Sequence, residues 1–215
     1  MYAEVQLVVF HITNYLIFEC HALQHVTCGS AIKLQNTYHR VRLHSHHVKY
    51  GSGSRQQSVT GTDVKQDVNS FWAIRGPTLK QNCARGEPIR CGQEIRLQHQ
   101  TTLKNLHSHH FSSPLSNSQE VSAFSGNGEG DTGDLWKVVC SRDVWTRDEA
   151  VSFKHVDTGV FLGVSGRKFG RPIHGQMEVI GLSMPDSSTK WKTAEGIFIH
   201  PSDFNPRRPY GHYEL

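Results

Sequence analysis

The sequence lacks the patterns that mark several common functional classes. Its net charge is only +4, and no basic run is longer than the pair Arg207–Arg208, so the clustered lysine and arginine of a nucleic-acid-binding face are missing. Its five cysteines contain no CxxC pair, which argues against a zinc ribbon and against a thioredoxin-type redox site. We therefore set nucleic acid aside as a partner.

Signatures of catalysis are missing too. The run Gly-Ser-Gly-Ser at residues 51–54 lies between expected strands and not at the strand-to-helix turn of a nucleophile elbow. There is no glycine-rich phosphate loop, and the acidic residues Asp131, Asp134, Asp148 and Glu149 lie in turn-rich segments, where we expect them to be solvated. These absences predict a protein that is not an enzyme and that uses no metal or other cofactor.

The composition of the 215-residue chain is typical of a soluble all-β protein. Hydrophobic residues make up 36% of it and glycine occurs 19 times, whereas no window has the periodicity of an amphipathic helix. Residues 31–34 and 94–97 alternate apolar and polar side chains, which is the period of a half-buried strand. Clusters of glycine, serine and asparagine at 51–54 and 126–128 predict turns between such strands.

An internal repeat organises the chain. Four apolar landmarks recur three times in one order, and the distance from the leucine to the tryptophan that closes each unit is 29, 30 and 29 positions. The first two copies also share the literal block Leu-His-Ser-His-His at 43–47 and 106–110. The landmarks are Leu34, Leu97 and Phe153, then Leu43, Leu106 and Leu162, then Val59, Val121 and Val179, and last Trp72, Trp136 and Trp191.

Three such units predict a β-trefoil. Each copy offers about four short strands and cannot bury its landmarks alone. Three units of roughly 55–64 residues, related by pseudo-threefold symmetry, close a small barrel with the landmarks inside, whereas a propeller would need more and shorter blades. We expect the three landmark tryptophans to be core residues rather than ligand-stacking platforms.

Both ends of the chain resemble targeting signals of the secretory pathway. Residues 5–18 form the one sustained apolar stretch, which is too short to span a bilayer comfortably. With the small residues that follow, it predicts a signal peptide over residues 1–22, the alternative being an ordinary buried strand. The chain ends in His212, Tyr213, Glu214 and Leu215, which resembles an endoplasmic reticulum retrieval tetrapeptide; residues 201–215 are expected to form the extended tail that presents it.

The repeats resemble MIR repeats, and their order is similar to that of the stromal cell-derived factor 2 family. The segments that carry the resemblance are the two Leu-His-Ser-His blocks, the loop at 50–54, and residues 56–61, 119–124 and 195–199. The resemblance implies a MIR β-trefoil over residues 26–200, with repeats at about 28–80, 91–140 and 147–199.

The resemblance also implies a function. Members of the family reside in the endoplasmic reticulum lumen, and this chain would be secreted if its retrieval tail were weak. They associate with a DnaJ-type co-chaperone and the luminal Hsp70, and they take part in quality control of misfolded client proteins. MIR repeats also occur in protein O-mannosyltransferases and in inositol-trisphosphate and ryanodine receptors, so the module does not define one task. The lack of a membrane-spanning run excludes the transferase and channel contexts.

The cysteines predict two disulfides. Removal of the signal segment takes Cys20 with it and leaves four cysteines, an even number. Cys83 and Cys91 are the closest pair and flank a turn that contains Gly86 and Pro88, so a bridge between them is sterically reasonable if the strand register allows it. Buried free thiols are the alternative, and the connectivity otherwise stays open.

Histidines, fifteen in all, carry the candidate site. His44 and His46 would point to one face of a strand, as would His107 and His109, so each pair has the geometry of a metal clamp. Copy three offers no equivalent ligand, so hydrogen bonds to turn backbone are the favoured role, and a shallow surface site for a ligand is the other interpretation. Its candidate residues are Ser45, His46, Tyr50 and Gln57 in copy one and Ser108, His109, Phe111 and Gln119 in copy two.

Two classes of function follow. A chaperone-complex accessory would bind unfolded clients through a large protein interface with little preference for sugars. A lectin-like module would bind O-mannosyl or other glycans, and its binding would be abolished by His46→Ala or His109→Ala. The family resemblance favours the chaperone accessory.

Overall fold

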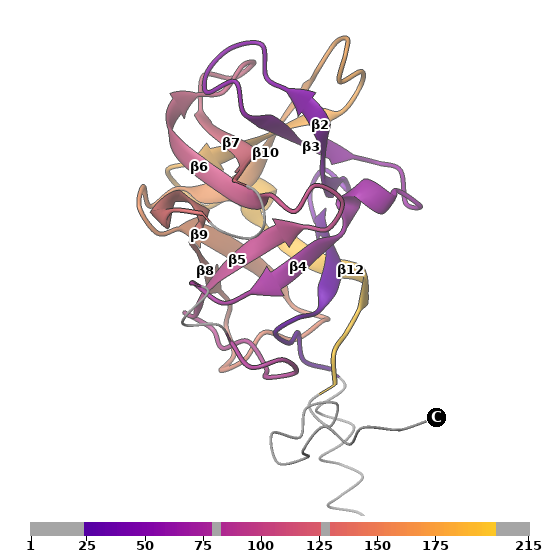
Figure 1. The fold of residues 1–215 in the computed structure, drawn as a ribbon, viewed down its shortest axis with the longest axis vertical. Coiled ribbons are helices and arrows are strands. Elements are labelled where there is room, and N and C mark those ends of the chain that lie inside the picture. The colour runs from indigo at the N-terminus through magenta and orange to yellow at the C-terminus, as the bar shows by residue number, and fades with distance from the viewer. Residues whose placement is uncertain (1–23, 79–82, 126–129, 201–215) are drawn as a thin grey trace, which may run out of the picture.

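The computed structural model describes residues 24–78, 83–125 and 130–200, and within them the chain is all-β (Figure 1). Four strands and one short 3-10 helix recur in each repeat. In chain order the elements are β1 (Ala31–Asn36), β2 (Arg42–Lys49), β3 (Gln57–Thr62), η1 (Val68–Ser70), β4 (Trp72–Arg75), β5 (Glu94–His99), β6 (Asn105–Ser112), β7 (Gln119–Phe124), η2 (Thr132–Asp134), β8 (Trp136–Val139), β9 (Ala150–His155), β10 (Phe161–Lys168), β11 (Met177–Leu182), η3 (Ser187–Thr189) and β12 (Trp191–Ile197).

The strands form a barrel and a cap that follow threefold symmetry. The first and fourth strands of the repeats close a ring through the antiparallel pairs β1–β4, β4–β5, β5–β8, β8–β9, β9–β12 and β12–β1. The hairpins β2–β3, β6–β7 and β10–β11 lie at one end of this barrel, where β3, β7 and β11 pair with one another (Figure 1). This arrangement is a β-trefoil, so the predicted fold class and its pseudo-threefold symmetry are confirmed.

The predicted landmarks form the core. All twelve are buried, with relative exposures of 0–1%. Each landmark tryptophan is also tied to the landmark leucine of its own repeat, because the indole Nε1 donates a hydrogen bond of 2.9 Å to that leucine's carbonyl oxygen. An indole N–H usually finds such a partner when it is buried. The recurrent leucine–tryptophan distance in the sequence therefore reflects one contact made three times.

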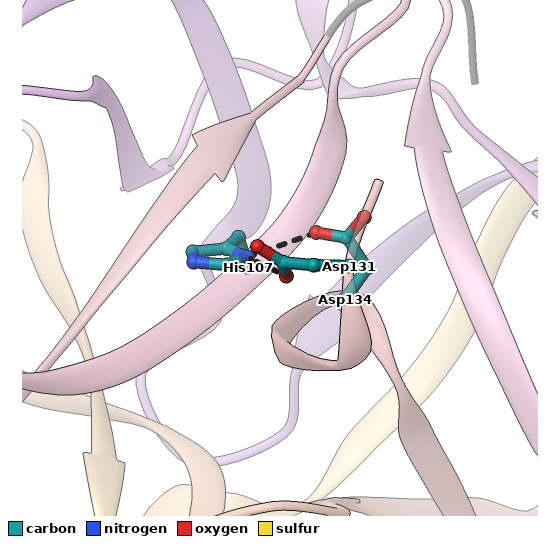
Figure 2. A group of neighbouring side chains, drawn as sticks. All are labelled: His107, Asp131 and Asp134. Atoms are coloured by element: carbon teal, nitrogen blue, oxygen red, sulfur yellow. Dashed lines mark hydrogen bonds and ion pairs between the residues drawn. The ribbon is translucent and has the colours of Figure 1, made fainter. Parts of the chain in front are cut away.

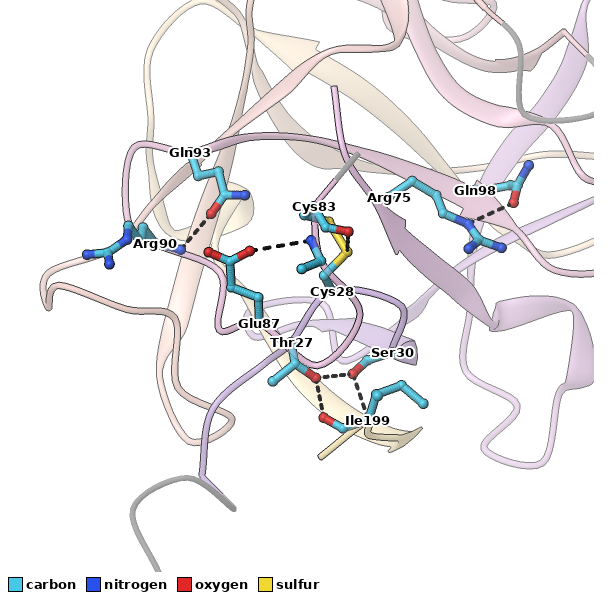
Figure 3. The surroundings of a disulfide bond; sticks show 11 residues. Thr27, Cys28, Ser30, Arg75, Cys83, Glu87, Arg90, Gln93, Gln98 and Ile199 are labelled. Atoms are coloured by element: carbon cyan, nitrogen blue, oxygen red, sulfur yellow. Dashed lines mark hydrogen bonds between the residues drawn. A yellow bond between two sulfur atoms is a disulfide. The ribbon is translucent and has the colours of Figure 1, made fainter. Parts of the chain in front are cut away.

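The end of the barrel opposite the cap is closed by two disulfides, as predicted in number but not in pairing. The bonds join Cys28 to Cys83 (Figure 3) and Cys91 to Cys140, so the expected bridge between Cys83 and Cys91 is wrong. In each bonded pair, one cysteine lies just before the first strand of a repeat and the other lies after the fourth strand of the same repeat. These strands are neighbours in the barrel, which brings their outer ends together.

The third repeat closes without a disulfide. Arg147 precedes β9, where the other repeats have Cys28 and Cys91, and its guanidinium lies 3.6 Å from the centroid of the Phe198 ring, which follows β12. Arg147 Nε also donates a hydrogen bond of 3.2 Å to the carbonyl of His25. A cation–π contact thus occupies the place that a sulfur bridge has in the other two repeats.

Several sequence expectations lie outside the described residues. They are the signal peptide over 1–22 with Cys20, the turn at 126–128, and the tail 201–215 with its terminal tetrapeptide. Among the residues that are described, no helix is long and apolar enough to cross a membrane.

Candidate functional site

Two clefts between described residues lie at junctions between repeats. In repeat two, β6 and η2 meet the turn between β9 and β10, and a cleft of about 300 Å³ lies between them. We call it the second-repeat cleft. It is lined by His107, Ser108, His109, His110, Asp131, Thr132, Gly133, Asp157 and Thr158.

A related cleft lies one third of a turn further round the trefoil. It is formed by β10, η3 and the turn between β1 and β2, and its volume is about 460 Å³. Its lining includes Tyr38, His39, Val164 and Ser165, and Ser187 and Ser188 of η3. Because Tyr38 and His39 follow β1 as Asp157 and Thr158 follow β9, the two clefts share one construction but present different side chains.

His107 lines the second-repeat cleft, and two carboxylates face the same side of its ring (Figure 2). Its Nδ1 is 2.9 Å from Asp134 Oδ1 and 3.6 Å from Asp131 Oδ1. Asp134 is completely buried, and its Oδ2 accepts a hydrogen bond of 2.9 Å from Asn105 Nδ2. Asp131 is exposed and caps η2, since its Oδ1 accepts the Gly133 N–H at 2.9 Å. The expectation that Asp134 is solvated is therefore wrong.

The equivalent place in repeat one is built differently. His44 Nδ1 is 2.7 Å from Asp67 Oδ2, and His44 Nε2 is 2.6 Å from His46 Nδ1. Burial acts to raise the pKa of Asp67, but hydrogen bonds from Ser70, His44 and the Asn69 amide together lower it below its ordinary value. Burial, reinforced by neighbouring His44, lowers the pKa of His46. Both ring nitrogens of His44 are thus engaged by the protein itself.

An aromatic ladder runs along the outer face of β6 and β7. His109 lies 4.6 Å from Phe111 and 4.9 Å from His107, and His107 lies 5.0 Å from Phe124, measured between ring centroids. The two ends of the ladder are open to solvent, because Phe111 and Phe124 are 48% and 37% exposed. The ladder and the second-repeat cleft share His107 and His109, so stacking surface and polar groups occur together at this site.

Three of the predicted ligand-binding residues, Ser45, Gln57 and Ser108, are buried, and Gln119 is half-buried. Ser45 and Ser108 are both buried, and their Oγ atoms donate hydrogen bonds to the carbonyls of Ser58 and Glu120. Gln57 is buried as well, and its Nε2 donates to Ser45 Oγ and to Thr102 Oγ1, in the next repeat. Gln119 repeats this bridge from Ser108 to Thr158 and is half-buried.

Tyr50 is also buried, although it was a candidate residue of the shallow surface site. Its hydroxyl donates toward the carbonyls of Val59 and Val121 at 2.8 and 3.0 Å, which fixes it where hairpins of two repeats meet. Burial raises its pKa well above the ordinary tyrosine value. Of the predicted set, His46, His109 and Phe111 keep solvent access, and the structure brings His109 and Phe111 together.

Sequence reasoning missed Asp134, Asp131 and Phe124 as members of this site. A signal for Asp134 was present, since it stands two positions before the landmark Trp136, as Ser70 stands before Trp72. A residue at that distance from a core tryptophan ends the 3-10 helix beneath the second strand and is buried in both repeats.

Comparisons with known proteins agree with this architecture. Residues 36–180 match the family model of the MIR domain. Stromal cell-derived factor 2-like protein 1 of Bos taurus is 60% identical over 190 residues, which cover 88% of this chain and 84% of that protein. Stromal cell-derived factor 2 of Homo sapiens is 58% identical over 178 residues, covering 83% and 84%.

Solved structures show the same relationship. The stromal cell-derived factor 2-like protein of Arabidopsis thaliana matches with a TM-score of 0.79 and 42% identity, covering 82% of this chain and 98% of that one. The S. cerevisiae protein O-mannosyltransferase complex bound to the sugar donor matches with a TM-score of 0.71 and 26% identity, covering 83% of this chain and 26% of that one.

The three-repeat barrel, its hairpin cap and the family match define the class of the molecule, which is a MIR-domain β-trefoil. Identity near 60% over more than four fifths of both chains goes further. The chain belongs to the stromal cell-derived factor 2 family.

Proposed function

We propose that the protein is a non-catalytic binding protein of the endoplasmic reticulum lumen, accessory to a complex of a DnaJ-type co-chaperone and the luminal Hsp70 in quality control of misfolded proteins. The observation that carries this proposal is the 60% identity to a stromal cell-derived factor 2-like protein over 84% of that protein's length. Two disulfides support the compartment, because such bonds persist in oxidising environments.

Retention is tested with the terminal tetrapeptide. Cells expressing the full chain are compared with cells expressing a chain that lacks residues 212–215, and the protein is measured in the lumen and in the medium. The full chain is expected to remain inside and the shortened chain to appear in the medium. Equal secretion of the two would contradict the proposed role of the tail.

The chaperone role is tested by reconstitution. Purified DnaJ-type co-chaperone, luminal Hsp70 and a reduced, aggregating client are mixed with or without the protein, and light scattering is followed. The protein is expected to form a complex with the co-chaperone in gel filtration and to lower the scattering. A protein that neither enters the complex nor changes aggregation would refute the role.

A second candidate function, glycan binding, is favoured by the aromatic ladder beside the second-repeat cleft. Exposed aromatic faces next to hydroxyl, imidazole and carboxylate groups suit sugar rings and their hydroxyls, and the cleft supplies Thr132, Thr158 and Asp157 beside His109. Repeat one lacks the ladder, because Val48 and Thr62 stand where repeat two has Phe111 and Phe124.

Calorimetry with free α-mannosides distinguishes this second function. His109→Ala and Phe111→Ala are expected to abolish binding, whereas the matched repeat-one variant His46→Ala should retain it. Aggregation suppression should be unaffected by all three variants if clients are recognised elsewhere. Binding that is absent in the unaltered chain, or lost equally in His46→Ala, would reject a glycan site in repeat two.

A further inference from the structure

His107, Asp131 and Asp134 form a cluster in which two carboxylates face one imidazole (Figure 2). Two carboxylates and one imidazole place three ligand atoms within 4.8 Å of one another. No lysine or arginine forms an ion pair with either aspartate among the described residues. The buried Asn105 donates Nδ2 to Asp134, and its own Oδ1 has no hydrogen-bond partner among those residues.

The cluster holds two carboxylates against one imidazole. Asp134 is completely buried, and a second carboxylate stands beside the same imidazole. Buried charges in proteins are paired with a partner of opposite charge or coordinate a metal ion. One imidazole carries at most one positive charge, so at least one negative charge remains when both aspartates are ionised. The cluster therefore matches a small divalent cation.

Comparison of the repeats shows that the cluster is particular to repeat two. Repeat one has Ser70 at the position of Asp134, so only the single carboxylate of Asp67 faces His44 there. Repeat three has Gly163 in place of the histidine and Thr189 in place of the second aspartate. A structural role common to all repeats would not require the second carboxylate.

Gly133 explains how one imidazole reaches both aspartates. A Cβ at this position would lie 2.4 Å from His107 Cε1 and 2.9 Å from Nδ1, which real contacts do not allow. Repeat one carries Asn69 at the equivalent position, and there the capping Asp67 is the one carboxylate that His44 Nδ1 contacts among the described residues. The glycine thus lets the ring of His107 approach η2 closely enough for Nδ1 to face both Oδ1 atoms.

We propose that His107 Nδ1, Asp131 Oδ1 and Asp134 Oδ1 form a binding site for a divalent first-row transition metal, with zinc as the representative ion. Ligand atoms about 2.1 Å from a tetrahedral zinc stand about 3.4 Å apart, and the two nitrogen–oxygen distances here are 2.9 and 3.6 Å. An imidazole nitrogen with two carboxylate oxygens suits zinc better than calcium or magnesium, which prefer oxygen ligands alone. The imidazole proton then resides on Nε2, and the exposed Asp131 side of the second-repeat cleft gives the ion access and a place for water.

The site goes beyond the binding roles proposed above, and its test is independent of them. The purified full chain is freed of metal with EDTA, and ZnCl₂ is titrated by calorimetry at neutral pH. Co²⁺ is titrated in parallel, because its visible absorption reports the geometry of the ligands. Asp131→Asn is the main variant, since asparagine is as good a helix cap as aspartate but carries no charge. Asp134→Ser reproduces the residue of repeat one, and Asp67→Asn in repeat one is the matched control.

One tight zinc equivalent is expected in the unaltered chain and in Asp67→Asn. We expect Asp131→Asn to weaken it at least tenfold and Asp134→Ser to remove it, together with the Co²⁺ spectrum. Zinc at a hundredfold excess over Kd should raise Tm by about 5–10 °C in the unaltered chain only. If Asp134→Ser does not fold, the zinc affinity of Asp131→Asn alone tests the site. Zinc binding that is absent, that is equal in Asp131→Asn, or that falls as much in Asp67→Asn overturns the site and assigns any uptake to surface histidines.

Discussion

Replacement of Trp136 by phenylalanine tests the contact on which the repeat depends. The indole Nε1 donates at 2.9 Å to the carbonyl of Leu106 in a fully buried environment. Phenylalanine leaves that carbonyl without its donor, which costs about 1–3 kcal/mol. The smaller ring also leaves a cavity of roughly 40 Å³, which at about 24 cal/mol per Å³ adds about 1 kcal/mol. The expected loss of unfolding free energy is therefore roughly 2–4 kcal/mol.

The threefold arrangement makes this prediction sharper. Trp72 and Trp191 donate to their own leucines at the same distance of 2.9 Å, so each Trp→Phe variant should lose a similar free energy. Trp136 and Trp72 also pack against a histidine ring, at 4.8 and 5.0 Å, whereas Trp191 stands opposite Asn36 of repeat one. The Trp191 variant should be the mildest, by up to about 1 kcal/mol.

The measurement is urea unfolding of the three single variants beside the unaltered chain, with the m-value compared across the series. Each variant should lower the midpoint at constant m, and Tm should fall by roughly 4–16 °C. Midpoints that stay unchanged, or a large loss in one repeat and none in the others, would refute the argument that one contact is made three times.

The remaining predictions concern pH and covalent closure. Burial lowers the pKa of His99 to about 4 from about 6.5 in the unfolded chain. The unfolded state therefore takes up the proton first, and the free energy of unfolding falls by up to about 3 kcal/mol as pH drops from 6.5 towards 4. His99→Asn, which copies Asn36 of repeat one, should flatten this part of the profile of urea midpoint against pH, and an unchanged slope would show that another group is responsible. Replacing Cys91 and Cys140 together by serine opens a loop with a sequence separation of 49 and should lower the free energy of unfolding by about 4 kcal/mol. Tm should then fall by roughly 8–16 °C. An equal Tm in the variant and the oxidised parent would contradict this.

The fold was predictable because its determinants are local and repeated. A leucine and a tryptophan about 30 positions apart in three copies could be recognised without knowing what they touch. The pattern of Leu43 and Trp72 survives in each repeat because one hydrogen bond in a closed core fixes both residues. The histidine that follows the second landmark in repeats one and two is replaced by Gly163 in repeat three, because this position does not take part in the hydrogen bond between leucine and tryptophan.

The site was less predictable because strand alternation shows which residues share a face and not what covers it. Ser45 is in a strand with alternating character, yet the neighbouring hairpins and Gln57 cover its hydroxyl. The cysteine pairing failed for a related reason. Cys83 and Cys91 are neighbours along the chain, but the barrel brings Cys83 to Cys28 through the pairing of β1 with β4. Asp134 was misplaced because a turn-rich segment was taken as surface, whereas a 3-10 turn carried it beneath β6.

The Arg147–Phe198 contact has a consequence for how the molecule is completed during synthesis. Each sulfur bridge joins cysteines of a single repeat, 28 with 83 and 91 with 140, so the two loops follow one another without overlap. Each can be sealed by an oxidase as soon as its own repeat has emerged. The Arg147–Phe198 contact forms only when the last residues of the trefoil are present, and it involves no oxidation. At the same place Thr27 Oγ1 donates a hydrogen bond to the carbonyl of Ile199. Closure of the third repeat therefore needs no oxidation, and of the three repeat closures described above it is the one that a reductant leaves intact.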